Sequence, residues 1–167
     1  MPEERAVKAV NLNKEMIAKL MCSALKARQN AYSPYSGFSV GAALLTAEGE
    51  VFTGCNVENM AYPAGLCAER VALFSAVAAG HRKFRALAVC GGTAGQEPED
   101  FCMPCGMCRQ ALSEFCGPDM EVYVGKGPEE FRRFTLGELL PHAFDSLPHT
   151  GETVQDLPGL QKGDSKR

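Results

Sequence analysis

The spacing of hydrophobic residues changes several times along the chain, and each change marks an expected element. Over residues 13–30, apolar side chains recur at the spacing of one helical face, which predicts an amphipathic helix. Residues 38–45 are a short, nearly continuous apolar run, and residues 50–56 alternate between polar and apolar. We therefore expect two strands that pair as a hairpin across the turn at Glu48-Gly49.

The second half of the chain alternates between helical and strand patterns. Residues 66–79 are rich in alanine and precede a glycine, which predicts a helix with Cys67 in its first turn. Residues 85–90 are an apolar run that Gly91-Gly92 is expected to end, and a second helix is expected over residues 104–115. Shorter elements follow: strands over 120–124 and 131–134, and a helix that begins at the capping-box sequence Thr135-Leu136-Gly137-Glu138.

The order of these elements predicts the fold class. A hairpin followed by alternating helices and strands indicates a mixed sheet with helices packed against it, an α/β sandwich. The 167 residues suit one domain. Residues 1–11 lack periodicity and are expected to form a loose arm, whereas residues 146–167 are rich in glycine, proline and charge and are expected to be a disordered tail. The folded domain is thus expected over residues 12–145.

Composition and charge narrow the function classes. With 46% hydrophobic and 22% charged residues, the chain has an ordinary globular composition. No apolar run reaches membrane-spanning length, and no export signal follows the charged N-terminus, so we expect no membrane partner. Eight cysteines then indicate a reducing compartment, cytoplasmic or nuclear. Since 17 basic residues face 20 acidic ones, the net charge is −3, which argues against a polynucleotide-binding face.

Three cysteines and one glutamate carry the candidate chemistry. Cys105 and Cys108 follow Pro104 at a helix start, where free N–H groups and the helix dipole favour thiolates. Cys67 can supply a third thiolate, and catalytic zinc sites use three protein ligands because the fourth position stays open to water. Glu69, two residues after Cys67, is then the natural proton carrier. A Cys-x-x-Cys pair alone also serves redox sites and structural zinc.

At these residues the chain resembles the small, free-nucleoside branch of the cytidine deaminase family. The resemblance spans about residues 12–145 and rests on Cys67-Ala68-Glu69, Cys105-Gly106-Met107-Cys108-Arg109-Gln110, Gly54-Cys55-Asn56-Val57-Glu58-Asn59, Phe38 and Tyr62-Pro63. It implies a three-layer α/β/α sandwich with one Zn²⁺ per chain. It also implies hydrolytic deamination of free cytidine and 2′-deoxycytidine in pyrimidine salvage, by a homotetramer in which neighbouring subunits complete the sites.

The resemblance also implies roles for individual residues. Glu69 exchanges protons with water and the cytosine ring, while Arg70, on the helical face of Cys67, offsets the excess charge of three thiolates. Gln110 supports the metal ligands from the same motif. The implied substrate-binding residues are Phe38 against the pyrimidine, the main chain of Ala68 at the base edge, Asn56 and Glu58 at the ribose 3′-hydroxyl, and Tyr62 and Phe144 from neighbouring subunits. Met60 departs from the alanine usual in the family.

Each of these residues has a plainer interpretation. Asn56 can be a turn residue, Phe38 ordinary core and Arg70 a surface ion-pair residue. Cys102 lies three residues before Cys105, so a ligand set of Cys102, Cys105 and Cys108 must be considered; we disfavour it because it leaves the family glutamate far from the metal. The remaining cysteines are expected to be buried free thiols, and the histidines to be surface residues without a metal role: Cys22, Cys55, Cys90, Cys116, His81, His142 and His149.

Three alternative functions compete with nucleoside salvage. The same zinc core could deaminate cytosine in RNA or single-stranded DNA, but the acidic balance and the lack of tryptophan argue against a polynucleotide groove. It could also act on a cytosine-bearing nucleoside antibiotic. A structural zinc or redox module would need a fourth ligand, and no further Cys or His stands at a helix start where it could close the site.

Overall fold

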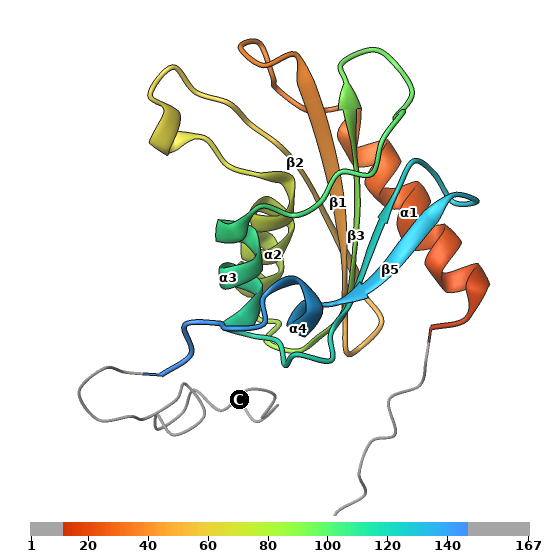
Figure 1. The fold of residues 1–167 in the computed structure, drawn as a ribbon, viewed down its shortest axis with the longest axis vertical. Helices are drawn as coiled ribbons and strands as arrows, with labels where there is room; N and C mark the ends of the chain where they lie inside the picture. Colours follow the sequence, from red (N-terminus) through yellow and green to blue (C-terminus); the bar gives the residue numbers. More distant parts are fainter. Residues whose placement is uncertain (1–11, 147–167) are drawn as a thin grey trace, which may run out of the picture.

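The computed structural model of the chain describes residues 12–146 (Figure 1). Its helices are α1 (Lys14–Arg28), α2 (Ala68–Ala78), α3 (Gly106–Ser113) and α4 (Leu136–Leu139), with a short 3-10 helix, η1 (Tyr62–Ala64). Its strands are β1 (Phe38–Thr46), β2 (Val51–Cys55), β3 (Phe84–Thr93), β4 (Glu121–Gly125) and β5 (Phe131–Thr135). The expected arm and residues 147–167 of the expected tail lie outside the described residues. Within residues 12–146, no helix is long and apolar enough to cross a membrane.

The strands form one mixed sheet in the order β2-β1-β3-β4-β5. β1 and β2 are the expected antiparallel hairpin, and β1 also pairs antiparallel with β3. β3 and β4 are parallel because α3 lies on the connection between them, and β5 returns antiparallel to β4. The sequence prediction of a mixed sheet with helices against it is confirmed.

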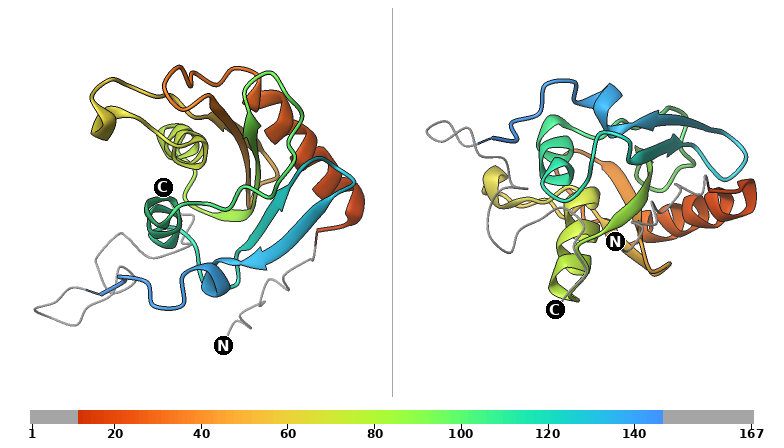
Figure 2. Two further views of the ribbon diagram at one scale, coloured as in Figure 1. Left: turned by 45° about the horizontal axis from the view of Figure 1, so that its top comes forward. Right: turned by 90° about the horizontal axis from the view of Figure 1, so that it is seen from below.

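Helices cover both faces of this sheet (Figure 2). α1 packs on one face, and its buried residues share a core with Ala43 and Leu45 of β1. α2 and α3 pack on the other face, where Ala42 and Leu44 belong to the second core. Alternate β1 residues thus enter opposite cores, as a strand buried on both faces requires. The arrangement is the three-layer α/β/α sandwich that the resemblance implies.

Two glycines of the hairpin allow the helices to approach the sheet closely. A Cβ atom at Gly54 of β2 would lie 2.4 Å from the Ala68 carbonyl oxygen and 2.5 Å from the Ala72 nitrogen, both in the backbone of α2. At Gly41 of β1, a Cβ would lie 2.0 Å from the Ala24 carbonyl oxygen of α1. No side chain fits in either place, so these glycines set how deeply α1 and α2 sit on opposite faces.

Local capping signals fix several element boundaries. Asn13 caps α1, because its side-chain oxygen accepts a hydrogen bond of 2.8 Å from the Met16 N–H. The expected capping box at α4 is present: the Thr135 hydroxyl accepts from the Glu138 N–H, and the Glu138 carboxylate accepts from the Thr135 N–H. Both helices therefore begin where the sequence predicts.

Three local predictions are wrong. β3 does not end at Gly91-Gly92 but continues to Thr93, because both glycines pair with β1, opposite Val40 and Ser39. The expected helices over 66–79 and 104–115 begin later, at Ala68 and Gly106, so Cys67 and Cys105 are their N-cap residues. Cys22 is exposed on the outer side of α1 and is no buried thiol, and Cys55 is only partly buried, whereas Cys90 and Cys116 are buried as expected.

Candidate active site

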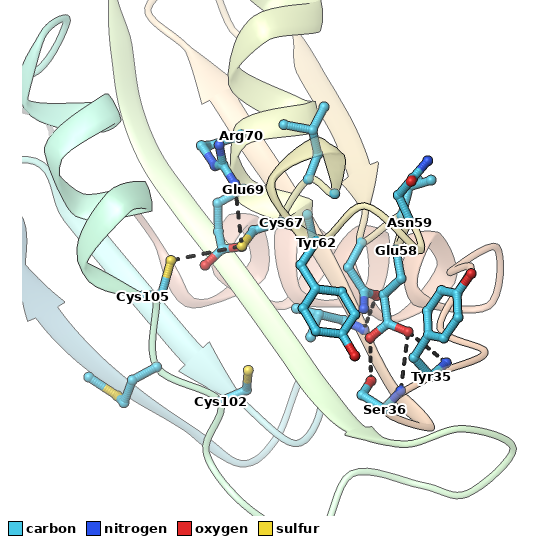
Figure 3. Close-up of a pocket in the computed structure, with 17 residues that line it drawn as sticks. Tyr35, Ser36, Glu58, Asn59, Tyr62, Cys67, Glu69, Arg70, Cys102 and Cys105 are labelled. Atoms are coloured by element: carbon cyan, nitrogen blue, oxygen red, sulfur yellow. Dashed lines mark hydrogen bonds between the residues drawn. The ribbon is translucent and has the colours of Figure 1, made fainter.

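One pocket gathers most of the predicted site residues (Figure 3). Its volume is about 610 Å³, and its walls come from the start of α2, the segment before α3, and the loops that precede β1 and follow β2. Cys67, Ala68, Glu69, Arg70 and Cys105 line it, together with Asn56, Glu58 and Tyr62. The cysteines and Glu69 lie at one end of the pocket, and Glu58 lies at the other.

Two helix N-caps and one first-turn residue bring three thiols together. The Cys67 Sγ lies 3.8 Å from the Cys105 Sγ, which in turn lies 3.4 Å from the Cys108 Sγ. Neither N-cap cysteine uses its side chain to cap its helix, so both sulfurs are free for another partner. All three ligand atoms lie within 4.8 Å of one another, and Cys102 is not in this group.

The geometry of the thiols fits a zinc ion. Tetrahedral zinc with Zn–S bonds of about 2.3 Å separates its sulfur ligands by about 3.8 Å, close to the two spacings observed here. Thiolates at helix starts are ligands that zinc prefers, and three of them leave one position of a tetrahedron open. Among residues 12–146, no other group of three or more Cys, His, Asp and Glu side chains brings its ligand atoms this close together.

Positive charge stands beside the sulfurs. The Arg70 Nη2 lies 3.9 Å from the Cys67 Sγ, as expected from their spacing on α2. The hydrogen bond from Cys108, with smaller contributions from Arg70 and Cys105, lowers the pKa of Cys67 to about 5. The same contact with Cys67, together with burial, raises the pKa of Cys108. The cluster therefore releases its first proton readily and needs a cation to become three thiolates.

Glu69 is buried in the first turn of α2, with only 4% of its surface exposed. Burial raises the pKa of its carboxyl group, and the negative charge of Cys67 raises it further. A carboxyl group whose pKa is raised by burial returns a proton more readily to a ligand's base than an exposed carboxylate would, and it can still accept one. Its position beside the thiol cluster is therefore suited to acid–base chemistry on a ligand in the pocket.

At the other end of the pocket, Asn56 and Glu58 are held by hydrogen bonds to the chain around them. The Asn56 amide accepts from the Val40 N–H at 2.7 Å and donates to the Phe38 carbonyl at 2.9 Å, so it extends the pairing of β2 with β1. The Glu58 carboxylate accepts hydrogen bonds from Tyr35 and Ser36. Both side chains are thus fixed in place before any ligand binds.

The remaining predicted residues differ in their relation to this pocket. Ala68 is buried in its wall, while Tyr62 lines the pocket but is 79% exposed. Phe38 lies in a small adjoining cavity instead of the main pocket and is 42% exposed. Phe144 is 68% exposed, and Gln110 holds its backbone: the Gln110 amide donates to the Phe144 carbonyl and accepts from its N–H. Gln110 is therefore hydrogen-bonded to the backbone of Phe144.

Sequence reasoning did not identify several residues that shape the pocket. Ser36 and Tyr35 contact Glu58 from a turn-rich segment, and Cys102 and Met103 form part of the wall. The turn sequence before β1 was a usable signal for Ser36, because serine in a tight turn commonly bonds nearby polar groups. Cys102 did carry a signal, its Cys-x-x-Cys spacing to Cys105, but the structure places it in the pocket wall and outside the thiol cluster.

A mixed α/β sheet whose helix starts bring three thiols next to a buried glutamate defines a zinc-dependent deaminase domain. Comparison with known proteins agrees. The family described as the cytidine and deoxycytidylate deaminase zinc-binding region matches residues 14–126. The chain belongs to this family.

Individual relatives resemble the chain over most of its length. A cytidine deaminase of Sporosarcina psychrophila is 47% identical over 128 residues, which are 77% of this chain and 90% of the relative. A cytidine deaminase of Halalkalibacterium halodurans is 44% identical over 145 residues, covering 87% of this chain and 100% of the relative. The crystal structure of the Burkholderia pseudomallei cytidine deaminase superposes with a TM-score of 0.69 at 48% identity, over 75% of this chain and 97% of that one.

Proposed function

We propose that this chain is a zinc-dependent cytidine deaminase that hydrolyses free cytidine and 2′-deoxycytidine to uridine and 2′-deoxyuridine with release of ammonia. The main support is a single pocket that has a three-thiol cluster and a buried glutamate at one end, and hydrogen-bonding groups suited to a sugar at the other. The reaction belongs to pyrimidine salvage, because it converts one free nucleoside into another.

In this proposal Cys67, Cys105 and Cys108 hold the zinc ion. Zinc, when bound, supplies Lewis-acid activation of a water molecule for attack on the pyrimidine ring. Glu69 takes a proton from the attacking water and delivers it to ring N3. It then takes the remaining proton from the new C4 hydroxyl and passes it to the amine, so that the C–N bond breaks, ammonia leaves and the C4 carbonyl forms. Arg70 contributes positive charge next to the Cys67 sulfur, which limits the negative charge that three thiolates would otherwise concentrate there.

The sugar lies at the opposite end of the pocket in this proposal. Glu58 and Asn56 bind the ribose 3′-hydroxyl, Phe38 packs against the pyrimidine, and the main chain at Ala68 reads the base edge. A site that places the Glu58 carboxylate at the 3′-hydroxyl disfavours substrates with a 3′-phosphate, because two negative charges would then lie side by side. Together with the net charge of −3, this favours a nucleoside over a polynucleotide.

We further propose that the chain assembles as a cytoplasmic homotetramer. Four large apolar side chains are strongly exposed: Met60 is 80% exposed, Tyr62, which lines the pocket, 79%, Phe144 68% and Met107 64%. Exposed apolar groups of this size are typical of a surface that a partner covers. In a tetramer, Tyr62 and Phe144 would then complete the pocket of a neighbouring subunit.

The activity is tested by incubating the zinc-loaded protein with cytidine, 2′-deoxycytidine and a cytosine-bearing oligonucleotide, and measuring uridine, deoxyuridine or uracil formation. We expect conversion of both nucleosides and no reaction with the oligonucleotide. Conversion of the oligonucleotide alone would refute the salvage function. The intersubunit role is tested by mixing Glu69→Gln chains with Phe144→Ala chains: activity above that of either parent supports it, and no restoration refutes it.

A further inference from the structure

The loop before β1 holds the Glu58 carboxylate through donors only. The Tyr35 N–H donates to Oε2 of Glu58 at 2.9 Å, and the Ser36 N–H donates to the same oxygen at 3.2 Å. The Ser36 hydroxyl contacts the other oxygen, Oε1. Figure 3 shows Ser36 and Tyr35 directed at Glu58 from one side, at the end of the pocket away from the cysteines.

The direction of the hydrogen bond between Ser36 and Glu58 follows from a second contact. The Phe38 N–H donates to the Ser36 Oγ at 3.0 Å. A backbone N–H can only donate, so the Ser36 oxygen is the acceptor in this contact. The hydroxyl of Ser36 therefore accepts from Phe38 and points its own hydrogen at Glu58. The donors of Ser36, and then those of Tyr35, hold the pKa of Glu58 below its usual range, so the carboxylate is ionised and only accepts.

Asn56 faces the same end of the pocket with the opposite polarity. Its oxygen accepts from the Val40 N–H, and one amide hydrogen is donated to the Phe38 carbonyl. One N–H of the amide remains for a ligand. An ionised Glu58 and this N–H together offer one acceptor and one donor, the pair that a single hydroxyl group satisfies.

We propose that Ser36 is a positioning residue: its hydroxyl and N–H orient the Glu58 carboxylate and keep it ionised as an acceptor for the 3′-hydroxyl of the sugar. The inference rests on the proposed deamination of nucleosides and on the 3′ subsite proposed with it, and it adds the residue that positions that subsite. A 3′-hydroxyl satisfies both Glu58 and Asn56. A 3′-hydrogen leaves both unpaired, and a 3′-fluorine, which accepts but cannot donate, also repels the carboxylate.

The first test needs only the wild-type, zinc-loaded protein. We measure kcat/KM for cytidine, 3′-deoxycytidine and 3′-deoxy-3′-fluorocytidine. Loss of a hydrogen bond to a charged group predicts a drop of about tenfold to a hundredfold from cytidine to the 3′-deoxy compound, and a further drop for the fluoro compound. If cytidine and 3′-deoxy-3′-fluorocytidine had equal kcat/KM, the inference would be overturned.

The second test uses Ser36→Ala, with Ser36→Thr to restore the hydroxyl. Ser33→Ala is the matched control, because Ser33 lies in the same loop and its hydroxyl bonds that of Ser39, not Glu58. We expect Ser36→Ala to lower kcat/KM for cytidine about tenfold and to leave 3′-deoxycytidine within about twofold. Ser36→Thr should recover most of the loss, and Ser33→Ala should keep the wild-type ratio between the two substrates.

Other outcomes have distinct meanings. Equal losses of kcat/KM on both substrates would reduce Ser36 to a structural role, and no loss on either substrate would show that Glu58 does not depend on it; either result overturns the inference. If Ser36→Ala does not fold, Ser36→Gly, which also lacks the hydroxyl, takes its place in the same comparison. If the wild-type protein converts no cytidine, the proposed function fails, and calorimetric binding of cytidine and its 3′-fluoro analogue to wild type and Ser36→Ala decides the inference separately.

Discussion

Replacing Gly54 with alanine should damage the site through the packing of a helix on the sheet. The new Cβ would lie 2.4 Å from the Ala68 carbonyl oxygen and 2.5 Å from the Ala72 nitrogen. Normal contact requires about 3.5 Å, so α2 must retreat by about 1 Å. Both contacted atoms belong to the helix backbone, and a rotamer change cannot relieve them. The first turn of α2 carries Glu69 and follows Cys67, so both would move away from α3.

Gly41→Ala provides the matched control because Gly41 lies in the same hairpin but faces α1. Its Cβ would lie 2.0 Å from the Ala24 carbonyl oxygen, so it is at least as crowded. Overpacking of this kind costs about 1–3 kcal/mol of unfolding free energy, and each kcal/mol lowers Tm by about 2–4 °C in a chain of this size. We expect both variants to lose stability, while only Gly54→Ala displaces the site.

The assay compares Tm, zinc content after dialysis, and kcat/KM for cytidine. A displacement of about 1 Å at a catalytic group can reduce activity by about a hundredfold, so we expect that loss in Gly54→Ala, together with weaker zinc retention. Gly41→Ala should keep its zinc and most of its kcat at temperatures well below its Tm. If Gly54→Ala is destabilised but keeps full zinc and wild-type kcat/KM, the docking of α2 on β2 does not position the site.

Three further predictions concern the metal, a buried cation and a buried phenol. Cys108→Ser should lose zinc and activity and lower Tm, as should treatment of the wild type with a chelator, whereas Cys22→Ser, at an exposed thiol, should change none of these. Arg28 is buried and donates to the carbonyls of Ser39, Thr93 and Gln96. Because a lysine cannot reach all three, Arg28→Lys should lower the free energy of unfolding, measured with urea, by about 2 kcal/mol. An unchanged urea midpoint would contradict this. Burial, together with Glu121, raises the pKa of Tyr123 to about 12, so the unfolded chain releases this proton first. This contribution to the free energy of unfolding is fully present below about pH 10 and is lost as the pH rises to 12. The unfolding free energy of Tyr123→Phe should therefore fall by about 2–3 kcal/mol less than that of the wild type over this range, and an identical fall would refute the assignment.

Short-range signals in the sequence predicted much of the fold. The hairpin, the two long helices and the capping box at Thr135 depend on residues within a few positions of one another, and all are present. The thiol cluster was predictable for a similar reason, because each cysteine lies at or near the start of a helix and the residues around it are typical of the family. The sequence predicted a hairpin and a mixed sheet, but not the order of the strands in that sheet.

Features that depend on distant contacts were not predictable from local pattern. Gly91-Gly92 resembles a strand end, but both residues pair with β1 residues that lie 51 and 53 positions earlier in the chain, Val40 and Ser39. Arg28 resembles a surface residue at the end of α1, yet it is buried and donates to the carbonyls of Thr93, at the end of β3, and of Gln96, in the loop that follows. The contact of Ser36 with Glu58 likewise joins residues 22 positions apart, and only the folded hairpin brings them together.

The most direct test of the account compares cytidine conversion by wild type and Glu69→Gln, with zinc measured in both. Gln keeps the size of the side chain but cannot carry a proton between water and the base, so the variant should lose activity by about a hundredfold to ten-thousandfold. Both proteins should hold about one zinc per chain, because Glu69 is not a ligand. A variant that keeps its zinc and converts cytidine at the wild-type rate would contradict the account.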